Sequence, residues 1–272
     1  MARSMPQDCF AGNVAIVTGA SSGIGRHLAL QLAERGAHLA LASRNAERLA
    51  ELCAQCRDRG GRAMAVPTDV ADEAQCRELI ERTVAAYGRM DTLINNAGVG
   101  LGARFEALRD PAAVRHVMQV NYFGAVYCCH FALPWLKAAR GRLVGVCSLA
   151  GRFPAPGAAA YAASKHAMAG FLDSLRVELA DVGVSVTVVY PGWVATGISS
   201  RALNADGQPI GEVCPGDRDG MTPAACAQRI VRGIERRRRE IVMTAQGRFG
   251  LWFRLIAPGL VDRISRRHMR PT

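Results

Sequence analysis

The sequence predicts an α/β fold with a doubly wound parallel sheet of about seven strands. Short runs of β-branched residues alternate with segments of helical spacing as far as Met243, and a glycine-rich turn, GASSGIG, joins the first run to the first helical segment. Alternation of this kind implies right-handed crossovers and helices on both faces of the sheet. We therefore expect one domain over residues 1–246, followed by a basic amphipathic extension over 247–272.

The strands and helices can be assigned in order from these runs. The first strand, 13–18, leads through the glycine turn to a helix that contains HLALQLAERG, with leucines at helical spacing. Further strands are expected at 37–43, 62–67, 90–94, 142–147, 184–189 and 240–243, and further helices at 46–59, 72–87, 111–137, 158–181 and 222–239. Because ligands of such sheets bind beyond the carboxyl ends of the strands, the residues that follow each strand are the candidates for a site.

The charge of the chain is concentrated at one end. The 272 residues are 50% hydrophobic, which is enough for one large core, and the net charge is +11. From Arg229 onward twelve arginines stand against three acidic residues, a net +9 that leaves only +2 for the rest. The run at 236–239 is short and typical of a solvated helix end, so nucleic-acid binding is not expected.

Cysteine usage and the lack of apolar segments indicate a cytoplasmic protein. Nine scattered cysteines, an odd number, do not form a disulfide framework, and residues 1–8 lack the apolar run of a signal peptide. No segment approaches the roughly 20 apolar residues of a spanning helix. The C-x-x-C of Cys53 and Cys56 lies inside an expected helix without a second pair, so no metal site is expected.

The glycine turn has the features of a dinucleotide site. Gly19, Gly23 and Gly25 allow a sharp turn and a close approach to a pyrophosphate, which the N-terminus of the following helix can hold. The spacing is G-x-x-x-G-x-G and differs from the commoner G-x-G-x-x-G. The flanking strand and helix nevertheless match the order that a dinucleotide site requires.

Tyr161 and Lys165 are four residues apart in an expected helix and therefore share one face. A nearby ammonium favours phenolate over phenol, whose ordinary pKa is about 10, and so brings the proton within range of transfer. Ser148 adds a hydroxyl that can hydrogen-bond a carbonyl oxygen. This combination implies interconversion of a carbonyl and an alcohol, although Tyr-x-x-x-Lys alone is also typical of an aromatic packed beneath a solvated lysine.

Six motifs in this order resemble the short-chain dehydrogenases/reductases, a family of single-domain Rossmann-fold oxidoreductases. The resemblance covers about 14–196 and extends more loosely to Met243. Its motifs are TGASSGIG at 18–25, NNAG at 95–98, Asn121 within VNYFGAV, Ser148, YAASK at 161–165 and PGWVAT at 191–196.

The resemblance implies a catalytic set of Asn121, Ser148, Tyr161 and Lys165. Tyr161 would be the general acid/base and Ser148 would polarise the carbonyl. Lys165 would lower the phenol pKa and bind the nicotinamide ribose, and Asn121 would hold a water that links Lys165 to solvent. Without the other three residues, Asn121 would be read as a helix-interior asparagine bonded to nearby backbone.

The resemblance also implies which residues contact the cofactor. Asp69 would contact the adenine ring, Asn95 would stabilise the sheet and line the cofactor, and Ile24 and Thr196 would lie near the nicotinamide. A plain turn aspartate is the alternative for Asp69. The expected contacts are Gly19, Ser21, Ser22, Gly23, Ile24, Gly25, Ser43, Arg44, Asp69, Val70, Asn95, Ala97, Gly98, Tyr161, Lys165, Pro191, Gly192, Val194 and Thr196.

The end of the second expected strand favours NADP(H) over NAD(H). A free ribose is usually held by an acidic residue there, whereas a 2′-phosphate requires positive charge, and this chain has Ser43 and Arg44. A solvated arginine at a helix start is the alternative. Two positions depart from the family pattern. Some NADPH users have a basic residue at the position of Ser22, which is not basic here. Cys147 stands where the family often has a second serine.

The substrate is expected to be lipophilic. The segment 197–221 lies where the family keeps its mobile substrate loop, and Trp193 and Phe153 either wall a pocket or belong to the core. In the extension, 249–272 interleaves apolar residues with arginines. Two placements stay open for it, an anionic membrane surface or packing against the body or a second subunit.

The leading hypothesis is therefore an NADPH-dependent carbonyl reductase, or the reverse alcohol dehydrogenase, for a lipophilic substrate. A 3-oxoacyl thioester reductase is the alternative within the same class. An NADPH-binding sensor without catalysis, docked through the basic extension, is the alternative from another class. The family often forms dimers or tetramers, so we expect a homo-oligomer.

Overall fold

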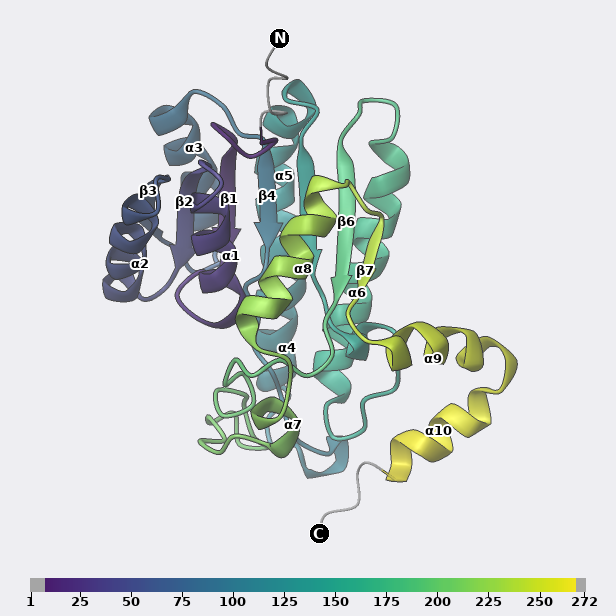
Figure 1. Ribbon diagram of the computed structural model, residues 1–272. Coiled ribbons are helices and arrows are strands. Elements are labelled where there is room, and N and C mark those ends of the chain that lie inside the picture. The colour runs from purple at the N-terminus through teal and green to yellow at the C-terminus, as the bar shows by residue number, and fades with distance from the viewer. Residues whose placement is uncertain (1–7, 268–272) are drawn as a thin grey trace.

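Seven parallel strands form one sheet in the order β3-β2-β1-β4-β5-β6-β7 (Figure 1). The computed structural model describes residues 8–267. Residues 1–7 of the expected domain and 268–272 of the expected extension lie outside the described residues. The order reverses between β1 and β4, which confirms the doubly wound sheet. The strands are β1 (Val14–Thr18), β2 (His38–Ser43), β3 (Arg62–Pro67), β4 (Thr92–Asn95), β5 (Arg142–Val146), β6 (Ser185–Tyr190) and β7 (Glu240–Val242).

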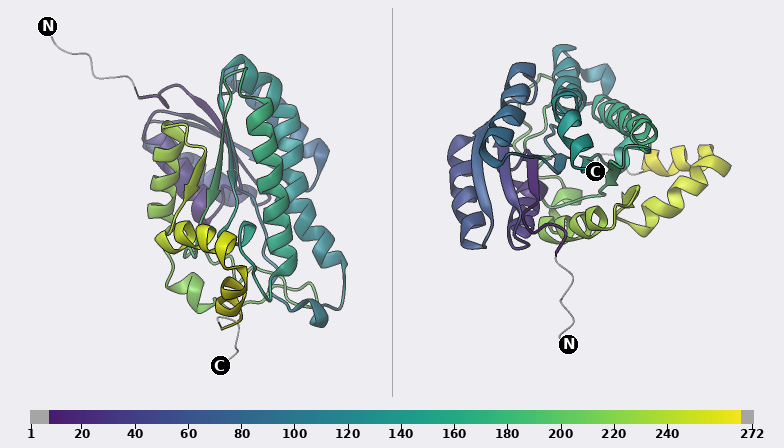
Figure 2. Two further views of the ribbon diagram at one scale, coloured as in Figure 1. Left: turned by 90° about the vertical axis from the view of Figure 1, so that its right-hand side faces the viewer. Right: turned by 90° about the horizontal axis from the view of Figure 1, so that it is seen from above.

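Helices cover both faces of this sheet (Figures 1 and 2). One face carries α1 (Gly23–Ala33), α2 (Ala46–Asp58) and α8 (Pro223–Glu235), and the other carries α3 (Glu73–Tyr87), α5 (Gly124–Ala138) and α6 (Ala159–Glu178). Each layer encloses its own cluster of buried apolar side chains. Because both faces are covered, every residue of β1 is buried.

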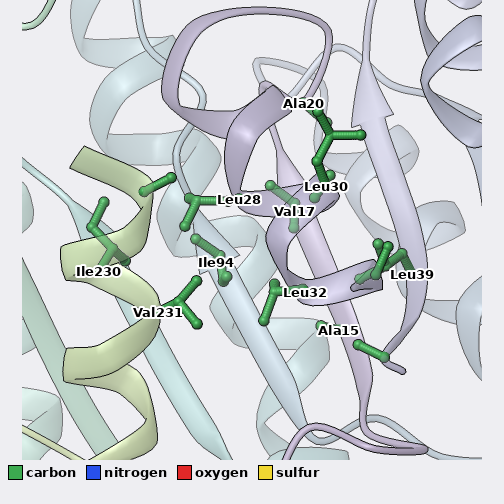
Figure 3. Packing of buried hydrophobic residues seen from close by; sticks show 14 of the residues in the cluster. Ala15, Val17, Ala20, Leu28, Leu30, Leu32, Leu39, Ile94, Ile230 and Val231 are labelled. Atoms are coloured by element: carbon green, nitrogen blue, oxygen red, sulfur yellow. The ribbon is translucent and has the colours of Figure 1, made fainter. Parts of the chain in front are cut away.

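The alternation of side chains along β1 divides the core between the two layers. Ala15 and Val17 belong to the cluster beneath α1 and α8, whereas Ile16 between them belongs to the opposite cluster. Figure 3 shows Leu28 and Leu32, four residues apart on α1, near Ile94 of the sheet and the buried side chains of α8. The hydrophobic periodicity in the sequence thus specifies which face each element buries.

The helix expected at 111–137 consists of three pieces. α4 (Ala112–Met118) is followed by a π-helical turn, Gln119–Phe123, and then by α5. Gly124, directly after the turn, packs so closely on Val70 that a Cβ there would lie 2.8 Å from Val70 Cγ2. The wider turn carries Asn121, whose side chain bonds outside its own helix. π-Turns inside helices frequently mark functional sites.

The last two segments of the chain contain more regular structure than the sequence suggests. The expected loop at 197–221 includes α7 (Pro215–Arg218), and the expected extension forms two helices, α9 (Ala245–Ile256) and α10 (Pro258–Arg267). Pro258 begins α10, as expected for a residue that cannot continue a helix. Among the described helices, none combines the length and apolar character needed to cross a membrane.

Candidate active site

One hydroxyl group joins the carboxyl ends of β1 and β4. Thr18 Oγ1 accepts the backbone N–H groups of Asn96, at 2.9 Å, and Ala97, at 3.0 Å. The Asn96 side chain donates in return to the carbonyl oxygens of Thr18, at 2.9 Å, and Gly19, at 3.3 Å. These bonds fix the turn after β1 against the turn after β4, at the point where the strand order reverses.

The glycine turn leaves no room for side chains. Gly19 has φ +64°, and a Cβ there would lie 2.8 Å from the Ala97 Cα. A Cβ on Gly25 would lie within 2.5 Å of the Asn96 amide nitrogen. In the described part of the chain, the side chain of Ser22, which precedes α1, makes no capping bond to the helix N-terminus. The first N–H groups of α1 therefore stay available for an anionic ligand, and the turn fits a pyrophosphate.

Tyr161, Ser148 and Lys165 converge at the carboxyl end of β5. Tyr161 and Lys165 lie on α6, and Ser148 immediately follows β5 at the start of a 3₁₀ turn, η3 (Leu149–Gly151). The Ser148 hydroxyl lies near enough to the Tyr161 phenol to act on its pKa, and Lys165 Nζ lies 5.8 Å from the centre of the phenol ring. Lys165 is only 3% exposed and donates to the carbonyl oxygen of Val146 at 3.1 Å. The spacing of these residues in the sequence is thus matched by a cluster in space.

The electrostatics of Tyr161 differ from the expectation. Burial raises the pKa of Tyr161 to about 12, and the nearby Ser148 hydroxyl counteracts only part of that rise. Burial also lowers the pKa of Lys165. The predicted lowering of the phenol pKa by Lys165 is therefore not what the structure shows, because desolvation disfavours both charged forms and the ammonium is bonded to Val146.

Asn121 ties the loop after β4 to α6. Its Oδ1 accepts the Val99 N–H at 2.8 Å, while its Nδ2 donates to the Val99 carbonyl oxygen and to Ser164 Oγ, both at 2.9 Å. A Cβ on Gly98 would lie 3.2 Å from Asn121 Oδ1 and 3.4 Å from Lys165 Nζ, so Asn121 and Lys165 flank the same glycine. The side chain thus positions backbone around Lys165, and its role in holding a water stays a prediction.

Asn95 and Asp69, two further predicted cofactor residues, lie at the end of β4 and after β3, along the same edge of the sheet. The neighbours Asn95 and Asn96 have different partners. Asn95 is 3% exposed and donates to Cys129 Sγ on α5, away from the glycine turn, whereas its neighbour Asn96 holds that turn. The sequence analysis expected Asn95 to stabilise the sheet and line the cofactor; its side chain faces α5, and its cofactor contact stays a prediction. Asp69 forms a turn in which its Oδ1 accepts the Ala71 N–H at 3.0 Å. Its adenine contact stays a prediction.

Positive charge gathers around the start of α2. Ser43 Oγ at the end of β2 is buried and, within residues 8–267, has no hydrogen-bond partner. Arg44 beside it is exposed, and in the same described range it has no ion pair. Ser21, Ser22 and Gly23 line a pocket of about 280 Å³ together with Arg26 of α1 and with Arg48 and the acidic Glu51 of α2. The sequence analysis did not identify Arg48, although its place in the first turn of the expected helix at 46–59, close to Arg44, was a usable signal.

Asp217 is a further residue that the sequence analysis missed. It is 1% exposed, and its carboxylate accepts the N–H groups of Thr196 (2.9 Å), Gly197 (3.3 Å) and Ser199 (3.1 Å). Ser199 Oγ also donates to it at 2.7 Å. Burial alone would raise the pKa of Asp217, but these bonds outweigh burial and lower it. Asp217 thus fixes the first residues of the 197–221 segment, which no local pattern reveals.

The two candidate wall residues differ in environment. Phe153 is partly buried, and a Cβ on Gly250 of α9 would lie 3.0 Å from its ring. Trp193 is 61% exposed and its indole packs on Gly216 of α7. Both flank the segments that border the site, so neither belongs to the main core. Among the described residues, no group of three or more His, Cys, Asp or Glu is arranged to hold a metal ion.

A Rossmann-type sheet with this turn and this cluster defines a nucleotide-binding oxidoreductase. A model of short chain dehydrogenases matches residues 13–206. The 11-beta-hydroxysteroid dehydrogenase-like 4A of Arabidopsis thaliana is 37% identical over 258 residues, which span 94% of this chain and 85% of that protein. The 11-beta-hydroxysteroid dehydrogenase A of Sesamum indicum is 35% identical over 263 residues, spanning 94% and 75% of the two chains. The chain belongs to the short-chain dehydrogenase/reductase family.

Solved structures show the same architecture. A short chain dehydrogenase/reductase from Burkholderia phymatum, in complex with NAD, superposes with a TM-score of 0.82 at 28% identity and covers 94% of this chain and 96% of its own. An alcohol dehydrogenase from the archaeon Thermococcus sibiricus, complexed with 5-hydroxy-NADP, gives a TM-score of 0.74 at 25% identity, with 85% and 95% covered.

Replacing Asp217 by alanine is expected to loosen the start of the 197–221 segment. The change leaves the N–H groups of Thr196, Gly197 and Ser199 without their acceptor, at a cost of about 1–3 kcal/mol. Hydrogen exchange of these amides should accelerate at least about tenfold. Asp219→Ala, which removes an exposed carboxylate two residues away, is the control. Equal protection in both variants would contradict the role of Asp217.

Proposed function

We propose that the chain is an NADP(H)-dependent oxidoreductase that interconverts a lipophilic ketone or aldehyde and the corresponding alcohol. The observation that carries this proposal is that the Ser148 hydroxyl, the Tyr161 phenol and buried Lys165 gather at the carboxyl end of the sheet, the edge that also carries the glycine turn. A hydroxyl and a phenol that are close neighbours can both reach a single carbonyl oxygen. Such a pair supports acid–base chemistry at that oxygen.

The chain offers contacts for a nicotinamide dinucleotide along the whole edge of the sheet. The Gly19–Gly25 turn and the N-terminus of α1 would hold the pyrophosphate, Asp69 the adenine, and Lys165 with Thr196 the nicotinamide end. The unpartnered Ser43 Oγ is a buried group that a ribose or phosphate oxygen would satisfy. When bound, the cofactor supplies or accepts the hydride at the carbonyl carbon.

The protein contributes proton transfer and orientation. Tyr161 donates its proton to the carbonyl oxygen as negative charge develops there, and Ser148 donates a hydrogen bond to the same oxygen. Lys165 keeps a positive charge near the phenolate that remains, and solvent restores the proton. In the oxidation direction, Tyr161 removes the proton of the alcohol. The raised pKa of Tyr161 keeps the phenol protonated at neutral pH, which favours reduction.

Preference for the 2′-phosphorylated cofactor is supported by the arginines around α2. Arg44 is exposed at the end of β2, and Arg48 and Arg26 line the pocket that begins at Ser21 and Ser22. No acidic residue follows β2 directly. Guanidinium groups bind phosphate through paired, charge-assisted hydrogen bonds. Similar structures were solved with NAD and with an NADP-type ligand, so the fold alone does not distinguish the two cofactors. The proposed preference for NADP(H) therefore rests on these positive charges.

A lipophilic substrate is supported by two observations. Relatives of this chain carry the name hydroxysteroid dehydrogenase, which indicates secondary alcohols and ketones on large apolar frameworks. The borders of the site present exposed apolar side chains, among them Trp193, Ile210 and Val213. We therefore propose polycyclic or long-chain ketones as the substrate class. Separately, we propose a homo-oligomer as the working form.

Turnover with NADPH against ketones, aldehydes and 3-oxoacyl thioesters tests the proposal. We expect oxidation of NADPH with lipophilic ketones and a loss of about a thousandfold or more in Tyr161→Phe, which keeps the ring but removes the transferable proton. Tyr127→Phe, on α5, is the matched control. Selective turnover of thioesters would identify the alternative reductase. Binding of NADPH without any turnover would instead support a sensor.

The two directions should depend differently on pH. With the pKa of Tyr161 near 12, reduction finds its phenol protonated from about pH 6 to 9 and should change little there. Oxidation requires phenolate and should rise about tenfold for each pH unit over that range. Saturating rates in both directions measure this difference. An oxidation rate that levels off near neutral pH would show instead that Lys165 lowers the phenol pKa in the loaded enzyme.

Arg44→Asp should shift cofactor preference toward NADH. Removing a guanidinium and adding a carboxylate repels the 2′-phosphate and offers an acceptor to the free ribose, so the ratio of KM values for NADPH and NADH should rise by about a hundredfold. Arg48→Gln should raise the KM for NADPH by about tenfold. Arg232→Asp, an exposed position on α8, should leave the ratio unchanged. An unchanged ratio in Arg44→Asp would contradict the assignment.

A further inference from the structure

The outer side of α9 is an apolar stripe. Phe249, Trp252, Phe253 and Ile256 recur at the spacing of one helix face, and their exposed fractions are 68%, 70%, 55% and 81%. Large apolar side chains that are exposed together on one helix mark an interaction surface, unlike single exposed residues. We call these four residues the α9 stripe.

The other side of α9 is fixed to the body. Gly247 packs on Leu149, where a Cβ would approach to 2.8 Å, and Gly250 packs on the ring of Phe153. The Arg254 guanidinium donates to the carbonyl oxygen of Arg152. These contacts all lie in or next to η3, the turn that follows Ser148. α9 and α10 together stand out from the rest of the molecule (Figures 1 and 2).

The hairpin of α9 and α10 is strongly positive. Residues 244–272 contain six arginines and a single acid, Asp262, a net charge of +5. Arg248 on α9 and Arg263 and Arg266 on α10 are exposed, and so is the apolar side chain of Leu260 on α10, at 44%. Aromatic and aliphatic side chains bordered by arginines are characteristic of helices that lie in the interface of anionic bilayers.

We propose that the α9–α10 hairpin docks on an anionic phospholipid surface. The α9 stripe would enter the boundary between head groups and acyl chains, while the arginines contact lipid phosphates. A second copy of this chain is less suitable as the occupant of the stripe. In a twofold contact the same positive surface would face itself, and like charges repel.

Docking would place the membrane next to the active site, because α9 rests on the turn that carries Ser148. A lipophilic ketone that partitions into the bilayer would then be concentrated at the entrance. This consequence rests on the proposed function, whereas the docking itself does not. A binding assay without NADPH and without substrate therefore tests the docking alone.

The test is flotation of the full-length protein with vesicles of phosphatidylcholine, alone or with one-third phosphatidylglycerol. We expect binding only to the anionic vesicles, and weaker binding as salt is added. Phe249→Ser with Trp252→Ser should lower the partition coefficient by roughly tenfold or more. Arg263→Gln with Arg266→Gln should lower it by roughly fivefold for each arginine.

The matched control is Trp135→Ser with Val177→Ser, which removes two exposed apolar side chains from α5 and α6. It should leave the partition coefficient unchanged, and thermal unfolding reports whether each variant is folded. Equal binding to neutral and anionic vesicles, or equal losses in the stripe and control variants, would overturn the proposal. So would the absence of vesicle binding together with a dimer that dissociates in Phe249→Ser with Trp252→Ser.

Discussion

The joint between β1 and β4 is the interaction on which the site depends. Thr18 Oγ1 accepts two backbone N–H groups from the turn after β4, and Asn96 returns two bonds to the turn after β1. Each bond contributes only about 0.5–1.5 kcal/mol net, but a buried group left unpaired costs more. The joint therefore admits one arrangement, in which the backbones approach too closely for any residue but glycine at Gly19.

Burial shifts the pKa values of both Tyr161 and Lys165. It raises the pKa of the Tyr161 phenol and lowers that of the Lys165 ammonium, so both shifts favour the uncharged forms. The Ser148 hydroxyl opposes the first shift, and the Val146 carbonyl oxygen accepts a hydrogen bond from Lys165. A phenol that keeps its proton at neutral pH suits a general acid, which is the role that the proposed reduction of carbonyls gives to Tyr161.

The turn after Ser148 links the site to the end of the chain. Arg152 pairs with Glu240 of β7 at 2.6 Å and lies 3.6 Å from Asp173 of α6, while its carbonyl oxygen accepts from Arg254 of α9. One short loop thus contacts α6, which carries Tyr161 and Lys165, the edge of the sheet and the projecting hairpin. Any surface that binds α9 therefore lies close to the proposed catalytic residues.

The sequence by itself determined the fold class, the order of strands and helices, and the segments that carry the site, because hydrophobic periodicity and glycine spacing are local properties of the chain. Side-chain direction and burial were decided by the tertiary structure. Asn96 rather than Asn95 holds the glycine turn, Asp217 organises backbone some 20 residues away in sequence, and Tyr161 has a raised pKa. Each of these features depends on groups from distant segments that come together only when the sheet and its helices assemble. The burial that shifts a pKa cannot be read from the residues next to the group in the sequence.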